Sequence, residues 1–222
     1  MGETVIYSYS SLNLYRTCPQ QFYRKYIAKD TLPYQGTEAA AGTDVHEAIE
    51  TALKTRQPLP KHMEVFEESI SSVRKKLDCA RIEQTIFLDE RFRFALTRPV
   101  KGFMAKLDVL LVSEDGKRAV VMDWKTGKPR EDTLQHDCYA LCVFRAFPDV
   151  ESITGFNVYL KTGKIGPQLE YSVEAAQGIQ ERLALMIAQI EADDFWQPKP
   201  GSPFPCNWCS AHKCKHYPKE VV

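Results

Sequence analysis

The sequence predicts a mixed α/β fold in which helices flank one central β-sheet. The hydrophobic pattern changes from a helical period to a period of two and back, in the order helices, strands, helix, strands, helix. A hydrophobic fraction of 44% in 222 residues is enough for an ordinary packed core. We find no internal repeat and no low-complexity tract, so we expect one domain over residues 1–222.

The first third of the chain is predicted to be helical. Residues 8–26 form a helix with a serine cap at Ser8 or Ser10 and a break near Pro19. Residues 38–55 carry an apolar stripe at helical spacing, and residues 62–80 form a third, more polar helix. The strands are expected only after these helices.

The middle of the chain changes to the pattern of strands. Residues 85–96, 102–112 and 118–125 are rich in β-branched and aromatic residues and alternate at period two. Asp115-Gly116 is a turn signal, so the last two strands are predicted to form an antiparallel hairpin. The rest of the chain continues as a helix, two strands and a long helix, over residues 131–146, 153–160, 168–173 and 174–194.

Charge and hydropathy exclude several classes of protein. The 29 basic and 29 acidic residues balance, so no overall field attracts nucleic acid and any basic surface must be local. The N-terminal segment lacks the pattern of a secretory signal, and no apolar run reaches the length of a membrane span. We therefore expect a soluble protein of the cytoplasm.

Four cysteines at the two ends of the chain predict a metal centre. Cys206, Cys209 and Cys214 form a C-x2-C-x4-C run, and Cys18 lies far upstream. In a reducing compartment such cysteines argue for a metal rather than for disulfides, and four thiolates suit either an iron–sulfur cluster or zinc. The centre would clamp the tail, residues 206–214, to the first helix. The other cysteines, Cys79, Cys138 and Cys142, are interpreted as ordinary helix residues.

The predicted hairpin gathers charged side chains on one face. Asp123 and Lys125 are two residues apart on a strand and point to the same side, where Asp108 of the preceding strand can approach them. Two acids close together can hold a hard divalent cation through oxygen ligands. A lysine beside them can assist the attacking water or stabilise charge on a phosphate.

Three further residues extend this group. His46 lies in the middle of a predicted helix, where a histidine alone is more often structural than a ligand. Gln135 and Tyr139 are four apart on one helix face, which would ordinarily be an exposed polar face. Glu90 shares a strand face with apolar residues and is a lesser candidate that points inward.

For DNA contact the best basic stretches are 125–130 and 161–164, and ordinary loop solvation explains them equally well.

The ordered set of these residues resembles a known family. The set is Gly42-x-x-x-His46, then Gly102 to Asp108, then Asp123-Trp124-Lys125-Thr126-Gly127, then Gln135-x-x-x-Tyr139. It resembles the RecB-like nuclease branch of the PD-(D/E)XK superfamily. With the cysteine pattern it is most similar to the iron–sulfur nucleases of that branch, which include CRISPR-associated adaptation exonucleases, the AddB nuclease domain and stand-alone phage enzymes. The resemblance runs from Ser8 to Tyr217 and implies a restriction-endonuclease-like fold.

The resemblance also implies roles for individual residues. His46, Asp108, Asp123 and the main-chain carbonyl of Trp124 would bind Mg²⁺ or Mn²⁺, and Lys125 would handle the attacking water. Gln135 and Tyr139 would contact the DNA backbone or support Lys125. The four cysteines, Cys18, Cys206, Cys209 and Cys214, would hold a [4Fe–4S] cluster, with Zn²⁺ as the alternative. Lys106 stands where relatives often have another residue type, and it has no assigned role.

Two functions from different classes follow. The first is a metal-dependent deoxyribonuclease, an exonuclease on single-stranded or frayed DNA ends, acting in recombination, repair or CRISPR adaptation in a phage or prokaryotic host. The second is a catalytically inactive, cluster- or zinc-stapled DNA-binding adaptor of a recombination complex. Both predict DNA as the partner and no membrane, and both leave room for a homo-oligomer or for recombination or CRISPR adaptation partners. Metal-dependent cleavage separates the two.

Overall fold

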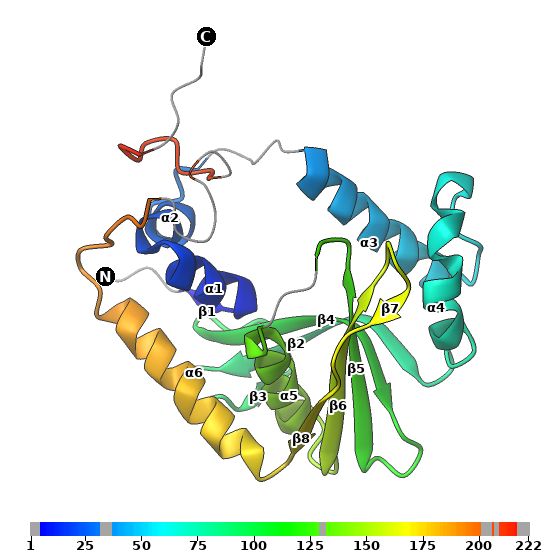
Figure 1. Ribbon diagram of the computed structural model, residues 1–222. Helices are drawn as coiled ribbons and strands as arrows, with labels where there is room; N and C mark the ends of the chain where they lie inside the picture. Colours follow the sequence, from blue (N-terminus) through cyan, green and yellow to red (C-terminus); the bar gives the residue numbers. More distant parts are fainter. Residues whose placement is uncertain (1–4, 32–36, 129–131, 201–205, 207–208, 217–222) are drawn as a thin grey trace.

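The chain folds around one eight-stranded mixed sheet (Figure 1). The computed structural model describes all residues except 1–4, 32–36, 129–131, 201–205, 207–208 and 217–222, and it describes no side chains for residues 37–43. The strand order is β3-β2-β4-β5-β6-β7, with β1 paired to β4 and β8 paired to β6. This architecture confirms the predicted mixed sheet flanked by helices.

The strands follow the predicted order closely. Their bounds are β1 Ile6–Tyr7, β2 Ala80–Asp89, β3 Phe94–Ala95, β4 Gly102–Val112, β5 Arg118–Lys125, β6 Ser152–Tyr159, β7 Lys164–Ile165 and β8 Leu169–Ser172. The predicted hairpin is present, since β4 pairs with β5 in antiparallel register. Strand β6 then runs parallel to β5, from Arg118↔Ser152 to Lys125↔Tyr159. A parallel pair needs a crossover, and α5 supplies it.

The helices lie on both sides of this sheet. Their bounds are α1 Tyr9–Thr17, α2 Pro19–Phe22, a π-helical turn η1 Tyr23–Ile27, α3 Thr37–Thr55, a 3₁₀ turn η2 Lys61–Phe66, α4 Glu67–Arg74, α5 Leu134–Ala146 and α6 Ala175–Glu191. Ser8 caps α1 through a reciprocal capping box with Ser11. The predicted break at Pro19 is confirmed, because Cys18 is extended and Pro19 begins α2.

Three predicted elements have clearly different boundaries in the structure. The helix expected over 62–80 is divided into η2 and α4 and ends at Arg74, and β2 begins at Ala80 instead of residue 85. Strand β2 is extended because residues 80–89 pair with β4 along most of its length, and this tertiary pairing overrides local propensity. The start of the helix expected over 131–146 falls partly outside the described residues, and α5 begins at Leu134.

The prediction that Glu90 points inward is wrong. Strand β2 ends at Asp89, whose carboxylate accepts hydrogen bonds from the backbone N–H groups of Arg91 and Arg93. Phe92 takes a left-handed φ of 56° in this turn. The strand alternation therefore stops before Glu90, and its side chain is exposed.

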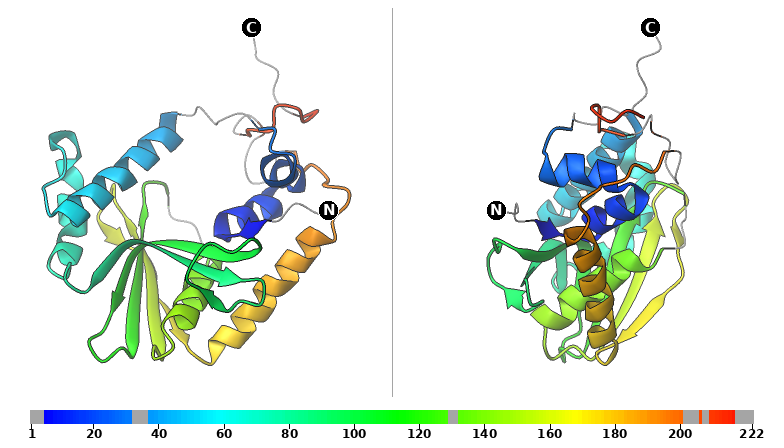
Figure 2. Two further views of the ribbon diagram at one scale, coloured as in Figure 1. Left: turned by 180° about the vertical axis from the view of Figure 1, so that it is seen from behind. Right: turned by 90° about the vertical axis from the view of Figure 1, so that its left-hand side faces the viewer.

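Each face of the sheet carries its own core. On one face, β4 and β5 residues such as Phe103, Leu107 and Val121 pack with α1, α5 and α6. On the other face, Val109, Met122 and Trp124 pack with α3 and α4. Figure 2 shows α3 and α4 on one side of the molecule and α1 and α6 on the other. The sheet is therefore covered on both faces, one by α1, α5 and α6 and the other by α3 and α4.

Helix α5 approaches β6 most closely at a glycine. A Cβ built on Gly155 would lie 2.8 Å from Nδ1 of His136, a side chain that is 2% exposed. The other ring nitrogen, Nε2, is 3.0 Å from Asn157 Oδ1. Asn157 is in turn the strand partner of Asp123. The packing of α5 on the sheet thus depends on the absence of a side chain at residue 155.

We predict that Gly155→Ala destabilises the protein by about 1–3 kcal/mol, because the added methyl group overpacks a buried contact. Chemical denaturation of the variant measures this loss. The matched control is Gly127→Ala, since a Cβ at Gly127 would meet no described atom within 4 Å. Equal stability of the two variants would contradict the close packing of His136 on β6.

Candidate active site

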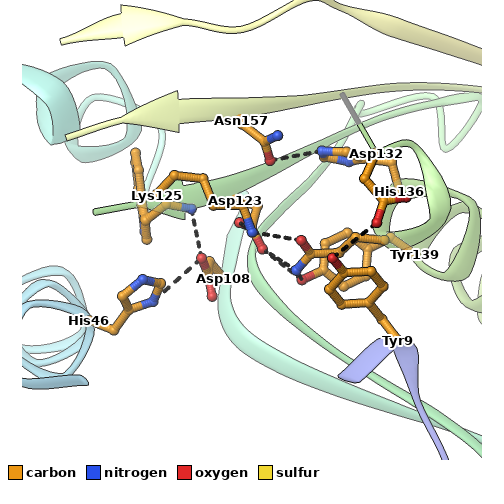
Figure 3. A network of polar contacts seen from close by, with 11 residues as sticks. Tyr9, His46, Asp108, Asp123, Lys125, Asp132, His136, Tyr139 and Asn157 are labelled. Carbon is orange, nitrogen blue, oxygen red and sulfur yellow. Dashed lines mark hydrogen bonds and ion pairs between the residues drawn. The ribbon is translucent and has the colours of Figure 1, made fainter. Parts of the chain in front are cut away.

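Strands β4 and β5 separate where the predicted acids lie. Their ladder runs from Val112↔Ala119 to Val109↔Met122, and no pair is formed between Asp108 and Asp123 among the described residues. Instead, Asp108 Oδ2 accepts a hydrogen bond of 2.7 Å from the backbone N–H of Trp124. Because a side chain takes the place of a ladder bond, the two strands part here, and we call the place where they part, beyond the last ladder pair, the opening. Figure 3 shows Asp108 and Asp123 together at this place.

Asp123 is buried within a polar network. Its side chain is 3% exposed overall. Oδ1 accepts hydrogen bonds from Gln135 Nε2 at 2.8 Å and from the Tyr139 hydroxyl at 2.7 Å. Lys125 Nζ lies 2.6 Å from Oδ2 and donates to Gln135 Oε1, also at 2.6 Å. The helical spacing of Gln135 and Tyr139 therefore brings both side chains onto the Asp-x-Lys strand, and the face is not an exposed one.

The second oxygen of Asp123 is short of partners. Burial raises the pKa of this carboxyl, and the nearby Asp108 raises it further, while Lys125 acts in the opposite direction. Apart from the ion pair with Lys125, Oδ2 is buried and accepts no hydrogen bond in the described part of the chain. The Lys125 ammonium is thus the described partner that compensates this buried oxygen, and a divalent cation in contact with Oδ2 would compensate it further.

Helix α3 contributes His46 to the same opening. His46 Nδ1 is 3.6 Å from Asp108 Oδ2, and its side chain is 32% exposed. The hydrogen-bonding contact with Asp108 raises the pKa of His46, and partial burial offsets some of that rise. Helix α3 thus places His46 beside Asp108, and its role as a metal ligand stays a prediction.

A third acid, Glu83, lies opposite Asp108 on β2. His46, Glu83 and Asp108 each present a ligand atom, and these atoms lie within 4.8 Å of one another. Glu83 has a left-handed φ of 56°, and it interrupts the ladder between Ile82↔Val109 and Gln84↔Leu107. Burial raises the pKa of its carboxyl, and Lys106, which forms an ion pair with it, acts in the opposite direction. The strain of this conformation is consistent with a constrained functional position.

Sequence reasoning missed Glu83. It placed residues 62–80 in a helix and began the next strand at residue 85, so Glu83 fell in the connection between them. The signal that could have found it is the register of β2, which sets Glu83 directly across from Asp108. That register becomes visible only when the strand is known to start at Ala80.

The four predicted cysteines lie around one small pocket. Cys18, Cys206, Cys209 and Cys214 all line it. Two backbone N–H groups donate to these sulfurs, from Lys199 to Cys18 at 3.4 Å and from Ala211 to Cys209 at 3.3 Å. Burial raises the pKa of the Cys209 thiol, and the other three cysteines add to that rise. The remaining cysteines lie elsewhere, with Cys138 and Cys142 buried in α5 and Cys79 exposed.

The tail is also held by contacts that involve no cysteine. Trp196 stacks on Phe22 with ring centroids 5.7 Å apart and contacts the rings of Tyr15 and Tyr23. Lys213 Nζ is 3.1 Å from Asp30 Oδ2. In both views of Figure 2 the tail lies beside α2. The two ends of the chain are therefore joined by aromatic packing and an ion pair as well as by the cysteine pocket.

The predicted basic loops adjoin the end of β5. Lys128, Lys161 and Lys164 are exposed, and the backbone N–H of Leu160 donates to the carbonyl of Lys125 at 2.9 Å. Arg130 lies outside the described residues. In the described part of the chain, no helix is both long and apolar enough to cross a membrane.

A comparison with models of known protein families identifies the family of this chain. The family model described as the PD-(D/E)XK nuclease superfamily matches residues 6–214. The chain belongs to that superfamily, and it is accordingly a nuclease-type protein. A search of curated proteins found no match.

Two solved structures are similar to this chain over most of its length, and the first of them shares its fold. The crystal structure named "Putative exonuclease" from Eubacterium rectale is similar over 98% of this chain and 90% of its own, with a TM-score of 0.55 and 13% sequence identity. The structure named SSO0001 is similar over 99% of this chain and 89% of its own, with a TM-score of 0.44 and 14% identity. At these identities the likeness concerns the fold alone.

We predict that the affinity for Mn²⁺ increases with pH, and that the midpoint of this increase lies above pH 6.5, the ordinary pKa of histidine. The raised pKa keeps His46 protonated to higher pH, and an imidazolium cannot bind a metal. Isothermal titration over a pH series measures this dependence. His46→Gln should weaken binding and flatten the pH profile, whereas His62→Gln, which changes an exposed histidine outside the site, should leave both unchanged. An affinity that is independent of pH would contradict the prediction.

Proposed function

We propose that this protein is a metal-dependent deoxyribonuclease of the RecB-like branch. It acts as an exonuclease on single-stranded or frayed DNA ends, in recombination, repair or CRISPR adaptation, in the cytoplasm of a prokaryotic or phage-infected cell. One observation carries the proposal: three separate elements direct His46, Asp108 and the Asp123–Lys125 pair into the opening between β4 and β5. The family match makes a phosphodiester the natural substrate of such a group.

The residues of the opening fit a divalent cation. We assign His46, Asp108, Asp123 and the carbonyl of Trp124 as ligands of Mg²⁺ or Mn²⁺, and we add Glu83 from its position beside His46 and Asp108. The buried Asp123 Oδ2, which accepts no hydrogen bond from the described residues, supports this assignment. When bound, the cation would polarise the scissile phosphate and lower the pKa of the attacking water.

The side chains around the proposed cation have separate roles in catalysis and in positioning. Lys125, whose ammonium is held by Gln135 Oε1 and Asp123 Oδ2, orients the attacking water and stabilises negative charge on the phosphate. Gln135 and Tyr139 both donate to Asp123 Oδ1, so they position the carboxylate and, through Gln135, the lysine. Such fixed positioning is worth much in a buried site, because no reorganisation is then needed during the reaction.

We propose a [4Fe–4S] cluster at the cysteine pocket, with Zn²⁺ as the alternative. A tetrahedral zinc ion with Zn–S bonds of about 2.3 Å would hold its sulfurs about 3.8 Å apart. Among the described residues, no three of the cysteine sulfurs lie within 4.8 Å of one another, which suits a larger centre. Backbone N–H groups that donate to Cys18 and Cys209 are also the type of contact that tunes such clusters.

We predict that wild-type protein cleaves end-labelled single-stranded DNA in Mg²⁺ or Mn²⁺ and that Lys125→Ala lowers the rate by at least about 100-fold. Anaerobically purified proteins and oligonucleotides labelled at either the 5′ or the 3′ end measure rate and polarity together. Lys117→Ala is the control, because Lys117 is an exposed lysine paired with Glu151 at the far hairpin turn.

Equal cleavage by wild type and Lys125→Ala would indicate a contaminant. DNA binding without cleavage in either metal would instead favour the inactive DNA-binding adaptor. In that case Asp123→Ala should bind DNA as well as the wild type does.

We predict that Cys209→Ser abolishes the visible absorbance of the cluster and lowers the melting temperature. The tail would remain partly docked, because the Trp196 stack and the Lys213–Asp30 ion pair do not depend on the cysteines. Visible spectra, iron and zinc content and thermal melts measure the effect. Cys79→Ser, at an exposed cysteine remote from the pocket, should match the wild type. An unchanged spectrum and melting temperature in Cys209→Ser would reject the cluster.

A further inference from the structure

An open pocket adjoins the candidate metal site. Its volume is about 150 Å³. It shares Gln135 and Tyr139 with the Asp123 network, and it shares Lys106 with the Glu83 ion pair. The polar residues that line it are Ser8, Tyr9, Ser10, Lys106, Gln135 and Tyr139. The pocket therefore lies beside the candidate site, between the start of α1, β4 and α5.

The chemistry of this lining favours an anion. Lys106 supplies a positive charge, and the other polar residues supply hydroxyl groups and an amide. None of the described residues that line the pocket is acidic. The Tyr9, Gln135 and Tyr139 side chains already donate to Asp132 and Asp123. A phosphate group in the pocket would therefore find the hydroxyl groups of Ser8 and Ser10, and the Lys106 ammonium once that ammonium leaves Glu83, with Tyr9 as a ring on which an adjacent base could stack.

Lys106 and the cation compete for the same carboxylate. Glu83 belongs to the three-ligand group with His46 and Asp108, and it also forms the ion pair with Lys106. The Glu83 side chain is 7% exposed, whereas that of Lys106 is 57% exposed. A lysine on a flexible stem can therefore leave Glu83 without crossing packed side chains. Once a divalent cation binds Glu83, the ammonium loses part of its attraction to that carboxylate and can turn to the pocket.

We propose that this pocket binds a phosphate of the DNA strand next to the scissile one, and that Lys106 exchanges Glu83 for that phosphate when the divalent cation binds. The inference rests on the proposed nuclease function and adds a substrate subsite to it. Its consequence is a coupling between ligands: the cation strengthens DNA binding, and DNA strengthens cation binding by the same factor. Lys106 is then a positioning residue for substrate and also the counter-ion of the site before metal binds.

Two binding measurements test this exchange. The affinity for Mn²⁺ is measured by isothermal titration without DNA. The affinity for a fluorescent single-stranded oligonucleotide is measured by anisotropy with and without Mn²⁺ over a salt series, with Lys125→Ala as the background so that the strand stays intact. The variants added to that background are Lys106→Met, Lys106→Gln and Glu83→Gln, and the control is Lys117→Met at an exposed lysine of the far hairpin turn.

The Lys106 and Glu83 variants are expected to change Mn²⁺ affinity and DNA affinity in opposite directions. Lys106→Met and Lys106→Gln bind Mn²⁺ more tightly than the background, because the competing ammonium is gone. In Mn²⁺ they bind DNA at least about fivefold more weakly, and the slope of log affinity against log salt falls by about 0.7 in magnitude. Glu83→Gln binds Mn²⁺ more weakly and, without metal, binds DNA more tightly, because Lys106 is already released. Lys117→Met changes none of these values.

Unchanged DNA affinity and salt slope in both Lys106 variants would overturn the proposal, and so would weaker Mn²⁺ binding by them. Thermal melts of each variant show that any loss is not one of folding. Cleavage by the protein with Lys125 intact is measured in parallel. If the protein with Lys125 intact cleaves DNA, and the Lys106 variants bind DNA and Mn²⁺ as tightly as the Lys125→Ala background does, then the nuclease proposal stands and only the proposed exchange of Lys106 is wrong. If it never cleaves, the nuclease proposal fails, and the binding data alone then decide whether Lys106 contacts phosphate.

Discussion

The hydrogen bond from the Trp124 N–H to Asp108 Oδ2 is the constraint on which the candidate site depends. It replaces a ladder bond between the two central strands, so β4 and β5 separate after Val109↔Met122. The β5 strand keeps its full pairing with β6, which holds Asp123 and Lys125 rigidly on the parted edge. A sheet that was paired to its end would have no room between these strands for a cation and a phosphate.

Burial of charge explains the polar side chains around that opening. Asp123 is nearly inaccessible to solvent, and its burial is tolerated because Gln135, Tyr139 and Lys125 surround the carboxylate. Glu83 is likewise partly buried and is compensated by Lys106. Each of these two acids thus has a cationic neighbour in the structure, Lys125 for Asp123 and Lys106 for Glu83.

Contacts between the two ends of the chain stabilise the N-terminal helices that lie beside the same site. Helix α1 contributes Tyr9 to the pocket and is followed by Cys18 and the aromatic residues that receive Trp196. The cysteine pocket, the aromatic stack and the Lys213–Asp30 ion pair all act between this N-terminal region and the tail. A metal centre at the cysteines would therefore stabilise α1, which forms one wall of the pocket beside the candidate site, from a distance.

Local periodicity was enough to predict most of the order of elements, the β4–β5 hairpin and the shared face of Asp108, Asp123 and Lys125, because strand and helix patterns depend on neighbouring residues. Periodicity put Gln135 and Tyr139 on one helix face, and only the family resemblance linked that face to the acids. The tertiary structure decided the role of residues 80–84, where pairing with β4 overrode local propensity and brought Glu83 opposite Asp108. It also decided that Glu90 is exposed and that Lys106 faces Glu83. These features depend on strand register and on where a strand turns, which are set by contacts between residues distant in sequence.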